Sequence, residues 1–487
     1  MGKSTELFEL IKSFNKAEKK YFKAFSSQFK SEQELSYVEL FDLIDAQEEY
    51  DETKIEAQLS NRVFAKNLSN GKNYLYHFLL KCLHNFHSGK SVRIQIRELY
   101  INAALLTERR LNTHAIKLLA KAEKIALEYE MNHELLTINL LQRHLFRTFT
   151  EKNVKERIHK LHNTFNQAIR QIEREHLLQS QYENLYIIHR PNNTPIEALD
   201  ELFQKYQIVI DALIPKDPIT FNELSIRCWT NSTYYRRKKK YKEAADSYEM
   251  LNLYFDQHSR FKIEYQARYI NFVSNFIAFL LYSLEDEDSI KRASQLITEL
   301  EGTEPSNSQL SIHKYDNLYY CKIIYYTRAK QFEKAVELAP EVWSFLIKYR
   351  QQLSKTRKMS IYYNYAFAIF MAGEYELSLD WLEYLLDNFD PKIVPDTTFM
   401  AQRLQIINHF ELNNDILVEH LMRTILRKYR NPKYGTVIVP TIKVIKKILR
   451  QPASKKILLQ DYCKTLESTA LLGDVKEWID YKYNRKD

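Results

Sequence analysis

The chain has 487 residues, of which 45% are apolar and 27% are charged, and this balance excludes an intrinsically disordered protein. Its 7 glycines and 11 prolines are too few for a fold rich in tight turns, hairpins or phosphate loops, so long helices packed through 34 tyrosines and 26 phenylalanines are favoured. The net charge of +9 comes from the C-terminal segment, because residues 421–487 carry 16 Lys and Arg against 6 Asp and Glu, whereas the rest carries 55 against 56.

Neither secretion nor membrane insertion is predicted. The N-terminal stretch MGKSTELFELIKSF lacks a long apolar core and a cleavage site. The most apolar stretch, residues 272–284, is too short to span a bilayer. The four cysteines lie far apart in sequence, which is typical of reduced thiols rather than of a disulfide framework. We therefore expect a cytoplasmic protein that has no membrane partner.

Residues 1–95 are predicted to form a helical N-terminal cap domain. One of its helices begins after Asn15 with a capping box, because Glu18 follows three residues later. A second helix is indicated by KNYLYHFLLKCLHNF, which places an apolar stripe on one face. That stripe consists of Leu75, Phe78, Leu79, Cys82, Leu83 and Phe86.

Residues 96–430 repeat a pattern of two helices. In the clearest copy, at residues 360–391, Gly373 can adopt a positive φ between the helices, and Ser378 is small where they should approach each other. Second helices are predicted to begin about 43 residues apart, at Leu111, Val154, Ile196, Tyr241, Ile290, Phe332, Tyr375 and Ile416. A single pair cannot bury both of its faces, so the pairs must stack.

The predicted fold is therefore all-α. We expect an α-solenoid of about eight antiparallel helix pairs behind the N-terminal cap, followed by a basic helical C-terminal cap at residues 431–487. The segment KYGTVIVP, residues 433–440, is the one strand-like run, and we expect a connector there because Gly435 and Pro440 interrupt it.

The paired pattern resembles the tetratricopeptide repeat (TPR). The copy around Gly373 matches that family at its aromatic opening position, first small position, turn glycine, second-helix signature and later packing positions. The matching residues are Tyr362, Ala366, Gly373, Tyr375, Ser378, Leu382 and Leu385. Because the family's repeat is shorter than 43 residues, the chain is best described as TPR-like. Residues 16–23 and 72–76 also resemble an uncharacterised family of helical-repeat proteins from the Bacteroidota, which implies a bacterial protein and no particular activity.

No motif for catalysis, cofactor binding or metal binding is found. The sequence lacks a Walker-type loop, a G-x-S-x-G elbow and a zinc-protease histidine pair. His77 and His84 lie opposite the apolar stripe that holds Cys82, so these side chains cannot easily converge on a metal ion. His159 and His162 have no evident third ligand. We therefore predict that the protein is not an enzyme and that it has no catalytic residue, cofactor or metal site.

The TPR resemblance implies a concave groove lined by the first helices of the pairs. Its expected residues are Trp229, Thr233, Arg236, Arg237, Tyr320, Ile324, Arg328, Tyr363, Phe367 and Phe370. Aromatic side chains mixed with arginines suit an acidic or carboxylate-ended peptide. Two plainer interpretations stay open, namely that the aromatic residues pack between helices and that the basic run at residues 236–242 is a solvated turn.

Three hypotheses about function follow. The leading one is a non-enzymatic scaffold or adaptor that binds a protein or peptide partner in its groove. The second is a nucleic-acid-associated protein that uses the basic C-terminal segment. The third is a regulatory solenoid that changes its curvature when it senses a small peptide. The sequence predicts neither the identity of the partner nor the oligomeric state.

Overall fold

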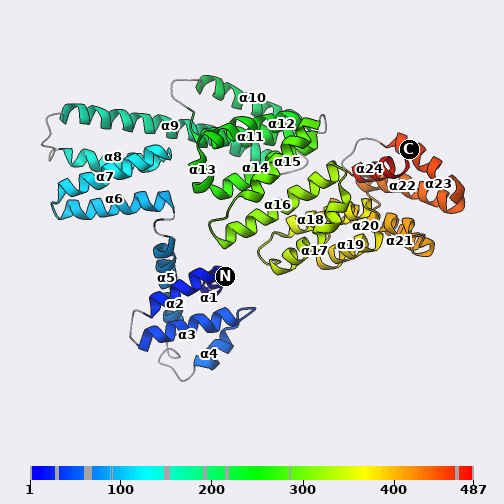
Figure 1. The fold of residues 1–487 in the computed structure, drawn as a ribbon, viewed down its shortest axis with the longest axis horizontal. Coiled ribbons are helices and arrows are strands. Elements are labelled where there is room, and N and C mark those ends of the chain that lie inside the picture. The colour runs from blue at the N-terminus through cyan, green and yellow to red at the C-terminus, as the bar shows by residue number, and fades with distance from the viewer. Residues whose placement is uncertain are drawn as a thin grey trace. The chain divides into compact units, whose positions relative to one another are not determined.

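The computed structural model describes residues 3–27, 32–59, 68–87, 89, 91–146, 154–189, 195–213, 219–283, 287–466 and 471–484. Within these ranges the chain forms 24 α-helices and no β-strand (Figure 1), so the all-α prediction is confirmed. None of the helices in the same ranges is both long enough and apolar enough to cross a membrane.

The helices are organised in two compact units. Unit 1 contains Met1–Lys239 and Ser247–Gln266, and unit 2 contains Lys240–Asp246 and Ala267–Asp487. The expected boundary at residue 95 falls inside α6, whereas the one at residue 430 falls between α21 and α22.

Five helices build the N-terminal part of unit 1: α1 (Lys3–Ser13), α2 (Lys16–Ser26), α3 (Glu32–Ala46), α4 (Glu52–Leu59) and α5 (Leu68–His87). The predicted capping box is present, since the Asn15 side chain accepts from the backbone of Glu18 and the Glu18 carboxylate accepts from the backbone of Asn15. The apolar stripe of α5 faces the core, where Leu75, Leu79 and Cys82 are fully buried.

The rest of unit 1 is made of α6 (Val92–Glu108), α7 (Asn112–Glu128), α8 (Asn132–His144), α9 (Val154–His189), α10 (Ile196–Leu213), α11 (Phe221–Arg237), most of α12 (Tyr241–Gln257) and α13 (Ser259–Glu264). One expectation is wrong here. The repeat spacing predicts a second helix from Val154 followed by a separate first helix, but α9 is one helix of 36 residues. Its sequence contains neither glycine nor proline, so nothing in it favours a break.

Unit 2 continues with α14 (Gln266–Ser283), α15 (Glu287–Gly302), α16 (Ser308–Arg328), α17 (Phe332–Lys348), α18 (Lys355–Met371), α19 (Tyr375–Asn388), α20 (Pro395–Glu411) and α21 (Asp415–Lys428). It ends with α22 (Pro432–Arg450), the short 3₁₀ helix η3 (Pro452–Ser454), α23 (Lys455–Thr465) and α24 (Gly473–Tyr483). Successive helices from α15 to α21 contact each other, and α16, α18 and α20 also contact one another in sequence order.

The turns inside the helix pairs share one geometry. Two residues before the second helix the backbone adopts a positive φ, at Arg110, Lys239, Lys330, Gly373 and Asn413. In the pair α18–α19 the next residue, Glu374, donates its N–H to the carbonyl of Ile369, while Gly373 donates to Phe370. This is a Schellman motif, which satisfies the last carbonyls of the first helix and reverses the chain.

Ser378 is fully buried between the helices of unit 2. Its hydroxyl donates to the backbone carbonyl of Ala366 on α18 at 2.8 Å and accepts from the Asn408 side chain of α20 at 3.2 Å. A larger side chain at this position would separate α19 from both neighbouring first helices. The small residue of the sequence pattern therefore marks a close contact between three helices.

The segment KYGTVIVP does not form a connector, because residues 433–440 lie inside α22. The start signal of this helix lies just before the segment. Asn431 caps the helix by accepting from the backbone of Tyr434, and Pro432 occupies the first turn, where a missing N–H costs nothing. Thr436 and Val439 are exposed, whereas Val437 and Ile438 pack inward and are buried. Tertiary packing thus overrides their preference for strands.

Candidate functional site

The first helices of unit 2 present equivalent residues along one side, which we call the first-helix face. The second helices α17, α19 and α21 begin at residues 332, 375 and 415, which aligns their preceding helices α16, α18 and α20. Three rows of equivalent positions result: Tyr320, Tyr363 and Arg403; Ile324, Phe367 and Ile407; and Thr327, Phe370 and Phe410. Within each helix these positions are three, four or seven residues apart, so they lie on the same helical face.

Helix α24 covers part of the first-helix face through the carboxylate of Asp474. The hydroxyl of Tyr363 donates to one carboxylate oxygen, and the guanidinium of Arg403 bonds to the other and to the backbone carbonyl of Leu471. The Arg403 side chain is fully buried, and Asp474 retains 10% exposure. Burial and the neighbouring Asp474 charge raise the pKa of Tyr363 well above its usual value, so this phenol stays a hydrogen-bond donor.

A second contact between α24 and this face centres on Glu411 at the end of α20. Its carboxylate, 3% exposed, accepts from Trp478 Nε1 at 3.0 Å, Lys482 Nζ at 2.7 Å and Tyr483 Oη at 2.8 Å. The Trp478 ring contacts the rings of Phe370 and Phe410, whose centroids are 6.1 Å and 6.4 Å from its own. The face therefore binds α24 through carboxylate pairing and an aromatic anchor.

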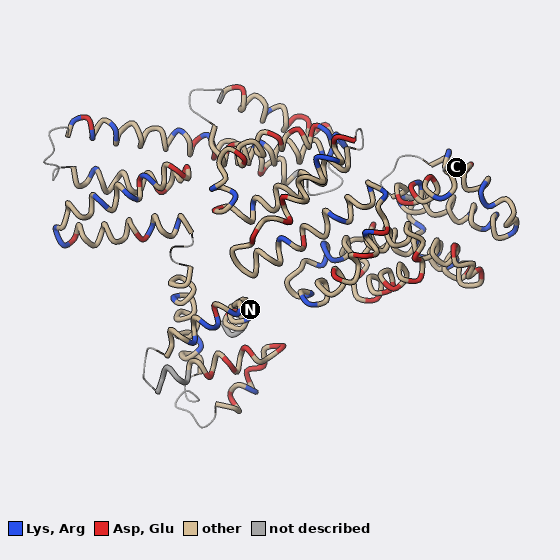
Figure 2. The backbone as a smooth tube through the Cα atoms, viewed as in Figure 1, with Lys and Arg blue, Asp and Glu red and all other residues tan. Residues whose placement is uncertain are grey.

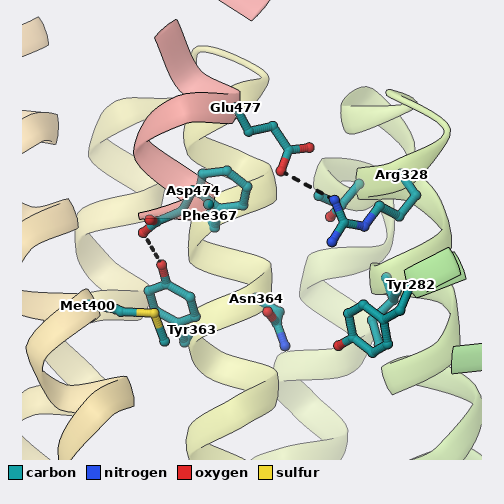
Figure 3. A pocket seen from close by; sticks show the side chains of 11 residues that line it. Tyr282, Arg328, Tyr363, Asn364, Phe367, Met400, Asp474 and Glu477 are labelled. Atoms are coloured by element: carbon teal, nitrogen blue, oxygen red, sulfur yellow. Dashed lines mark hydrogen bonds and ion pairs between the residues drawn. The ribbon is translucent and has the colours of Figure 1, made fainter. Parts of the chain in front are cut away.

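Next to α24 the first-helix face contains a pocket of about 240 Å³ (Figure 3). Its walls come from α14, α16, α18, α20 and α24. The lining residues are Tyr282, Ile324, Thr327, Arg328, Tyr363, Asn364, Phe367, Met400, Gly473, Asp474 and Glu477. Aromatic and aliphatic walls with a few convergent polar groups are typical of a binding site.

Two opposite charges meet at the rim of this pocket. Figure 3 shows Glu477 of α24 directed toward Arg328 of α16, with 3.9 Å between the carboxylate oxygen and the guanidinium nitrogen. Burial raises the pKa of Glu477, although Arg328 opposes this effect and Asp474 adds to it. The guanidinium also lies over the ring of Tyr282, 5.8 Å from its centroid.

The predicted groove residues of unit 2 gather at this site. Ile324, Arg328, Tyr363 and Phe367 line the pocket, and Phe370 lies beside Trp478. Tyr320 lies in the same row as Tyr363 but outside the pocket lining, and the guanidinium of Arg357 stacks 4.3 Å from its ring centroid. Tyr363, Phe367 and Phe370 are buried, so they also serve the packing role that the sequence left open.

The remaining four predicted groove residues belong to α11 of unit 1. The half-buried Trp229 ring lies 6.1 Å from the ring of Tyr182 on α9. Thr233 and Arg237 are half-buried, and Arg236 is exposed. These residues therefore form a separate surface on unit 1.

Sequence reasoning missed the α20 and α24 contributions to the site. Arg403 and Phe410 could have been found, because shifting Tyr363 and Phe370 by the 40 residues between the starts of α19 and α21 leads to them. The sequence places this second helix at Ile416, one residue after the start of α21 at Asp415, so the predicted alignment misses the two residues by one position. Asp474, Glu477 and Trp478 follow no repeat, so only the tertiary structure identifies them as site residues.

Within the described part of the chain, no three His, Cys, Asp or Glu side chains come together as a metal site requires. His87, near Cys82 in sequence, instead pairs with Glu18 at 2.8 Å. Comparisons of the chain with protein-family models, with curated proteins and with solved structures find no match. The TPR resemblance and the site are therefore interpreted from the residues alone.

Proposed function

We infer that this chain is a non-enzymatic, TPR-like scaffold that binds an acidic segment of a partner protein on the first-helix face of unit 2. One observation carries this proposal: that face already binds α24 through the carboxylate of Asp474 and the ring of Trp478, and it places the guanidinium of Arg328 beside them. Donors and aromatic surfaces of this kind suit an acidic peptide from another protein.

The helical framework explains how such a face would gain affinity. Arg328 and Phe367 come from α16 and α18, two helices that already contact each other, so little conformational entropy of the backbone is lost when they bind a partner segment. Next to α24, the pocket that contains Arg328 and Phe367 offers the part of the face where a partner segment can dock.

The test starts from tagged full-length protein and affinity capture with nuclease and salt controls. A captured protein is then titrated against Arg328→Glu and against Lys334→Glu, which reverses an exposed charge in the first turn of α17. We expect Arg328→Glu to weaken binding by about 1.5–3 kcal/mol or more, since a charge-assisted hydrogen bond is lost. Equal losses in both variants would indicate general charge attraction and would contradict the proposal.

The surface on α11 requires a separate test, because it belongs to unit 1. The variant carrying Arg236→Glu and Arg237→Glu is compared with one carrying Lys239→Glu and Lys240→Glu, two exposed positions in the following turn. If α11 contributes to partner binding, only the first variant loses affinity. Unchanged affinity in both would restrict the partner site to unit 2.

A second candidate function, nucleic-acid association, is favoured by the surface of α22. Four exposed basic residues form a stripe on one face of this helix, because three of them follow the first by three, four and seven residues. They are Lys443, Lys446, Lys447 and Arg450. Figure 2 marks Lys and Arg along α22 and α23. A third candidate, a peptide-sensing solenoid, would use the same first-helix face.

We also propose that the scaffold acts in the bacterial cytoplasm. The four cysteines, Cys82, Cys228, Cys321 and Cys463, are buried free thiols. Free thiols are typical of reducing compartments. Fractionation of the native host cells, followed by detection of the protein with an antibody, tests this location.

A further inference from the structure

The pocket beside α24 contains a separated pair of opposite charges. The Arg328 guanidinium and the Glu477 carboxylate are 3.9 Å apart, which is too long for a hydrogen bond. In the described part of the chain, neither charged group forms a hydrogen bond with another protein group. Both groups therefore retain their capacity to bind a ligand in the pocket.

The other charged group that lines the pocket is already neutralised. Asp474 is held by Arg403 and by the hydroxyl of Tyr363. This leaves one positive and one negative group, Arg328 and Glu477, for a ligand. A ligand with a single charge would pair with only one of these two half-buried groups, whereas a zwitterion can pair with both.

The size and walls of the pocket narrow the ligand further. Its volume of about 240 Å³ is smaller than the roughly 300–1,000 Å³ of pockets for drug-sized molecules, which indicates a small metabolite. Its other lining residues include three aromatic residues and a methionine, beside the polar Thr327 and Asn364; the four are Tyr282, Tyr363, Phe367 and Met400. Such walls favour an aliphatic or aromatic side chain.

We propose that this pocket binds a free α-amino acid with an apolar side chain. The ligand carboxylate faces the Arg328 guanidinium, and the ligand ammonium faces the Glu477 carboxylate. A single carbon separates the ammonium and the carboxylate of an α-amino acid. The two groups can therefore face Glu477 and Arg328 at the same time, since these side chains are only 3.9 Å apart. The side chain extends between Tyr363, Phe367 and Met400.

Ligand binding would also connect two helices. Arg328 belongs to α16 and Glu477 to α24, so the amino acid would bridge them through its own charges. Amide hydrogen exchange in residues 473–483 should therefore slow when the pocket is occupied, whereas exchange in α7 of unit 1 should not change.

The experiment uses the full-length protein and the twenty amino acids as probes, first by thermal unfolding and then by calorimetric titration. We expect leucine, methionine or phenylalanine to bind and to raise the midpoint temperature of unfolding as the amino-acid concentration increases. Glycine, aspartate and lysine should not bind. N-acetylation or amidation of the bound amino acid should reduce affinity by about tenfold or more, because either change removes one charge-assisted hydrogen bond.

Two variants assign the binding to this pocket. Arg328→Gln and Glu477→Gln should each lower affinity by about tenfold or more. Glu477→Gln keeps the side-chain shape and removes a half-buried charge that forms no hydrogen bond in the described residues, so folding should be retained, which circular dichroism can verify. The matched controls Glu333→Gln and Lys334→Gln alter exposed charges nearby and should bind as the wild type does.

The proposal is overturned if none of the twenty amino acids binds to the wild type at millimolar concentration. It is also overturned if the affinity survives both Arg328→Gln and Glu477→Gln. Because these measurements need no partner protein, either result leaves the scaffold proposal intact. Conversely, if no partner protein binds but an amino acid does, the scaffold proposal fails and the amino-acid proposal stands.

Discussion

At the scale of single residues, the buried guanidinium of Arg403 fixes the end of unit 2. It bonds to Asp474 and to the carbonyl of Leu471, and Tyr363 completes the shell of the same carboxylate. A buried ion pair adds little net stability over apolar residues of similar shape, but losing one partner leaves an uncompensated charge. The cluster therefore specifies how α24 lies on the first-helix face.

Asp474→Asn should lower the free energy of unfolding by about 3–5 kcal/mol, because Arg403 stays buried without a counter-charge. Urea denaturation followed by circular dichroism measures this change. Asp461→Asn is the control, since Asp461 and Lys464 form an exposed pair whose loss costs at most about 1 kcal/mol. Adding Arg403→Met to Asp474→Asn should restore part of the loss. Similar values for Asp474→Asn and Asp461→Asn would disprove the role of the cluster.

Glu411 should make unit 2 sensitive to acid. Burial raises the pKa of its carboxyl, but the hydrogen bond from Lys482 and the charges of Lys455 and Lys482 outweigh burial, so the pKa lies below its usual 4.5. A carboxylate with a lowered pKa in the folded state stabilises the protein above pH 4.5, and this contribution is lost as the pH falls through the folded-state pKa.

Glu411→Gln should accordingly be less stable than the wild type at pH 7, by roughly 3 kcal/mol for a broken buried pair, and the difference should shrink below about pH 4.5. Urea titrations at a series of pH values measure both curves. Glu419→Gln, which alters an exposed carboxylate on α21, should stay within about 0.5 kcal/mol throughout. A difference in unfolding free energy between the wild type and Glu411→Gln that does not depend on pH would contradict the role given to the Glu411 carboxylate.

At the scale of the helix pair, the shared geometry of the turns matters more than the residue that occupies them. The positive-φ position holds glycine only at Gly373 among the described pairs, whereas Lys330 and Arg110 adopt φ values of 56° and 61° at the equivalent positions. A left-handed conformation costs an L-residue with a side chain about 1–2 kcal/mol. The Schellman hydrogen bonds and the stacking of the pairs offset that strain.

Lys330→Gly should therefore stabilise the protein by up to about 1 kcal/mol, once the greater backbone entropy of unfolded glycine is included. Gly373→Ala should destabilise it by about 1 kcal/mol, and solely through φ, because an added Cβ there meets no atom within 4 Å. Thermal unfolding measures both changes. The two substitutions should change stability in opposite directions. A change in the same direction for both would refute the explanation based on the left-handed backbone.

These turns also explain how much of the fold the sequence could predict. Helices begin at Val154, Ile196, Tyr241, Phe332 and Tyr375 as expected, because turn chemistry and apolar spacing are local properties. The break expected within α9 was wrong, because that helix contains no glycine or proline that would favour a break. The connector expected at residues 433–440 was wrong, because burial of Val437 and Ile438 favours the helix there. Part of the candidate site could be predicted from the repeat, but the position of α24 depends on long-range side-chain pairing.

At the scale of the whole molecule, charge is distributed unevenly along the chain. The net charge of residues 421–487 comes from 16 basic and 6 acidic residues, and the basic stripe of α22 supplies four of the basic ones. Two acidic residues of the same segment, Asp474 and Glu477, face inward toward the first-helix face. The exposed surface of the segment is therefore enriched in Lys and Arg, which favours contact with a polyanion.

If the stripe binds nucleic acid, its affinity should fall steeply with salt. Neutralising about four phosphates of duplex DNA gives a slope of about −3.6 when the logarithm of the affinity is plotted against the logarithm of the salt concentration. Replacing Lys443, Lys446, Lys447 and Arg450 by glutamine should bring the slope close to zero, as measured by fluorescence anisotropy over a range of salt concentrations. The matched control replaces Lys117, Lys121 and Lys124 by glutamine, since these lysines form an exposed stripe of similar spacing on α7. Because counterion release depends on which cations touch phosphates, the control should keep the wild-type slope. Equal slopes in both variants would exclude the α22 stripe as the binding surface.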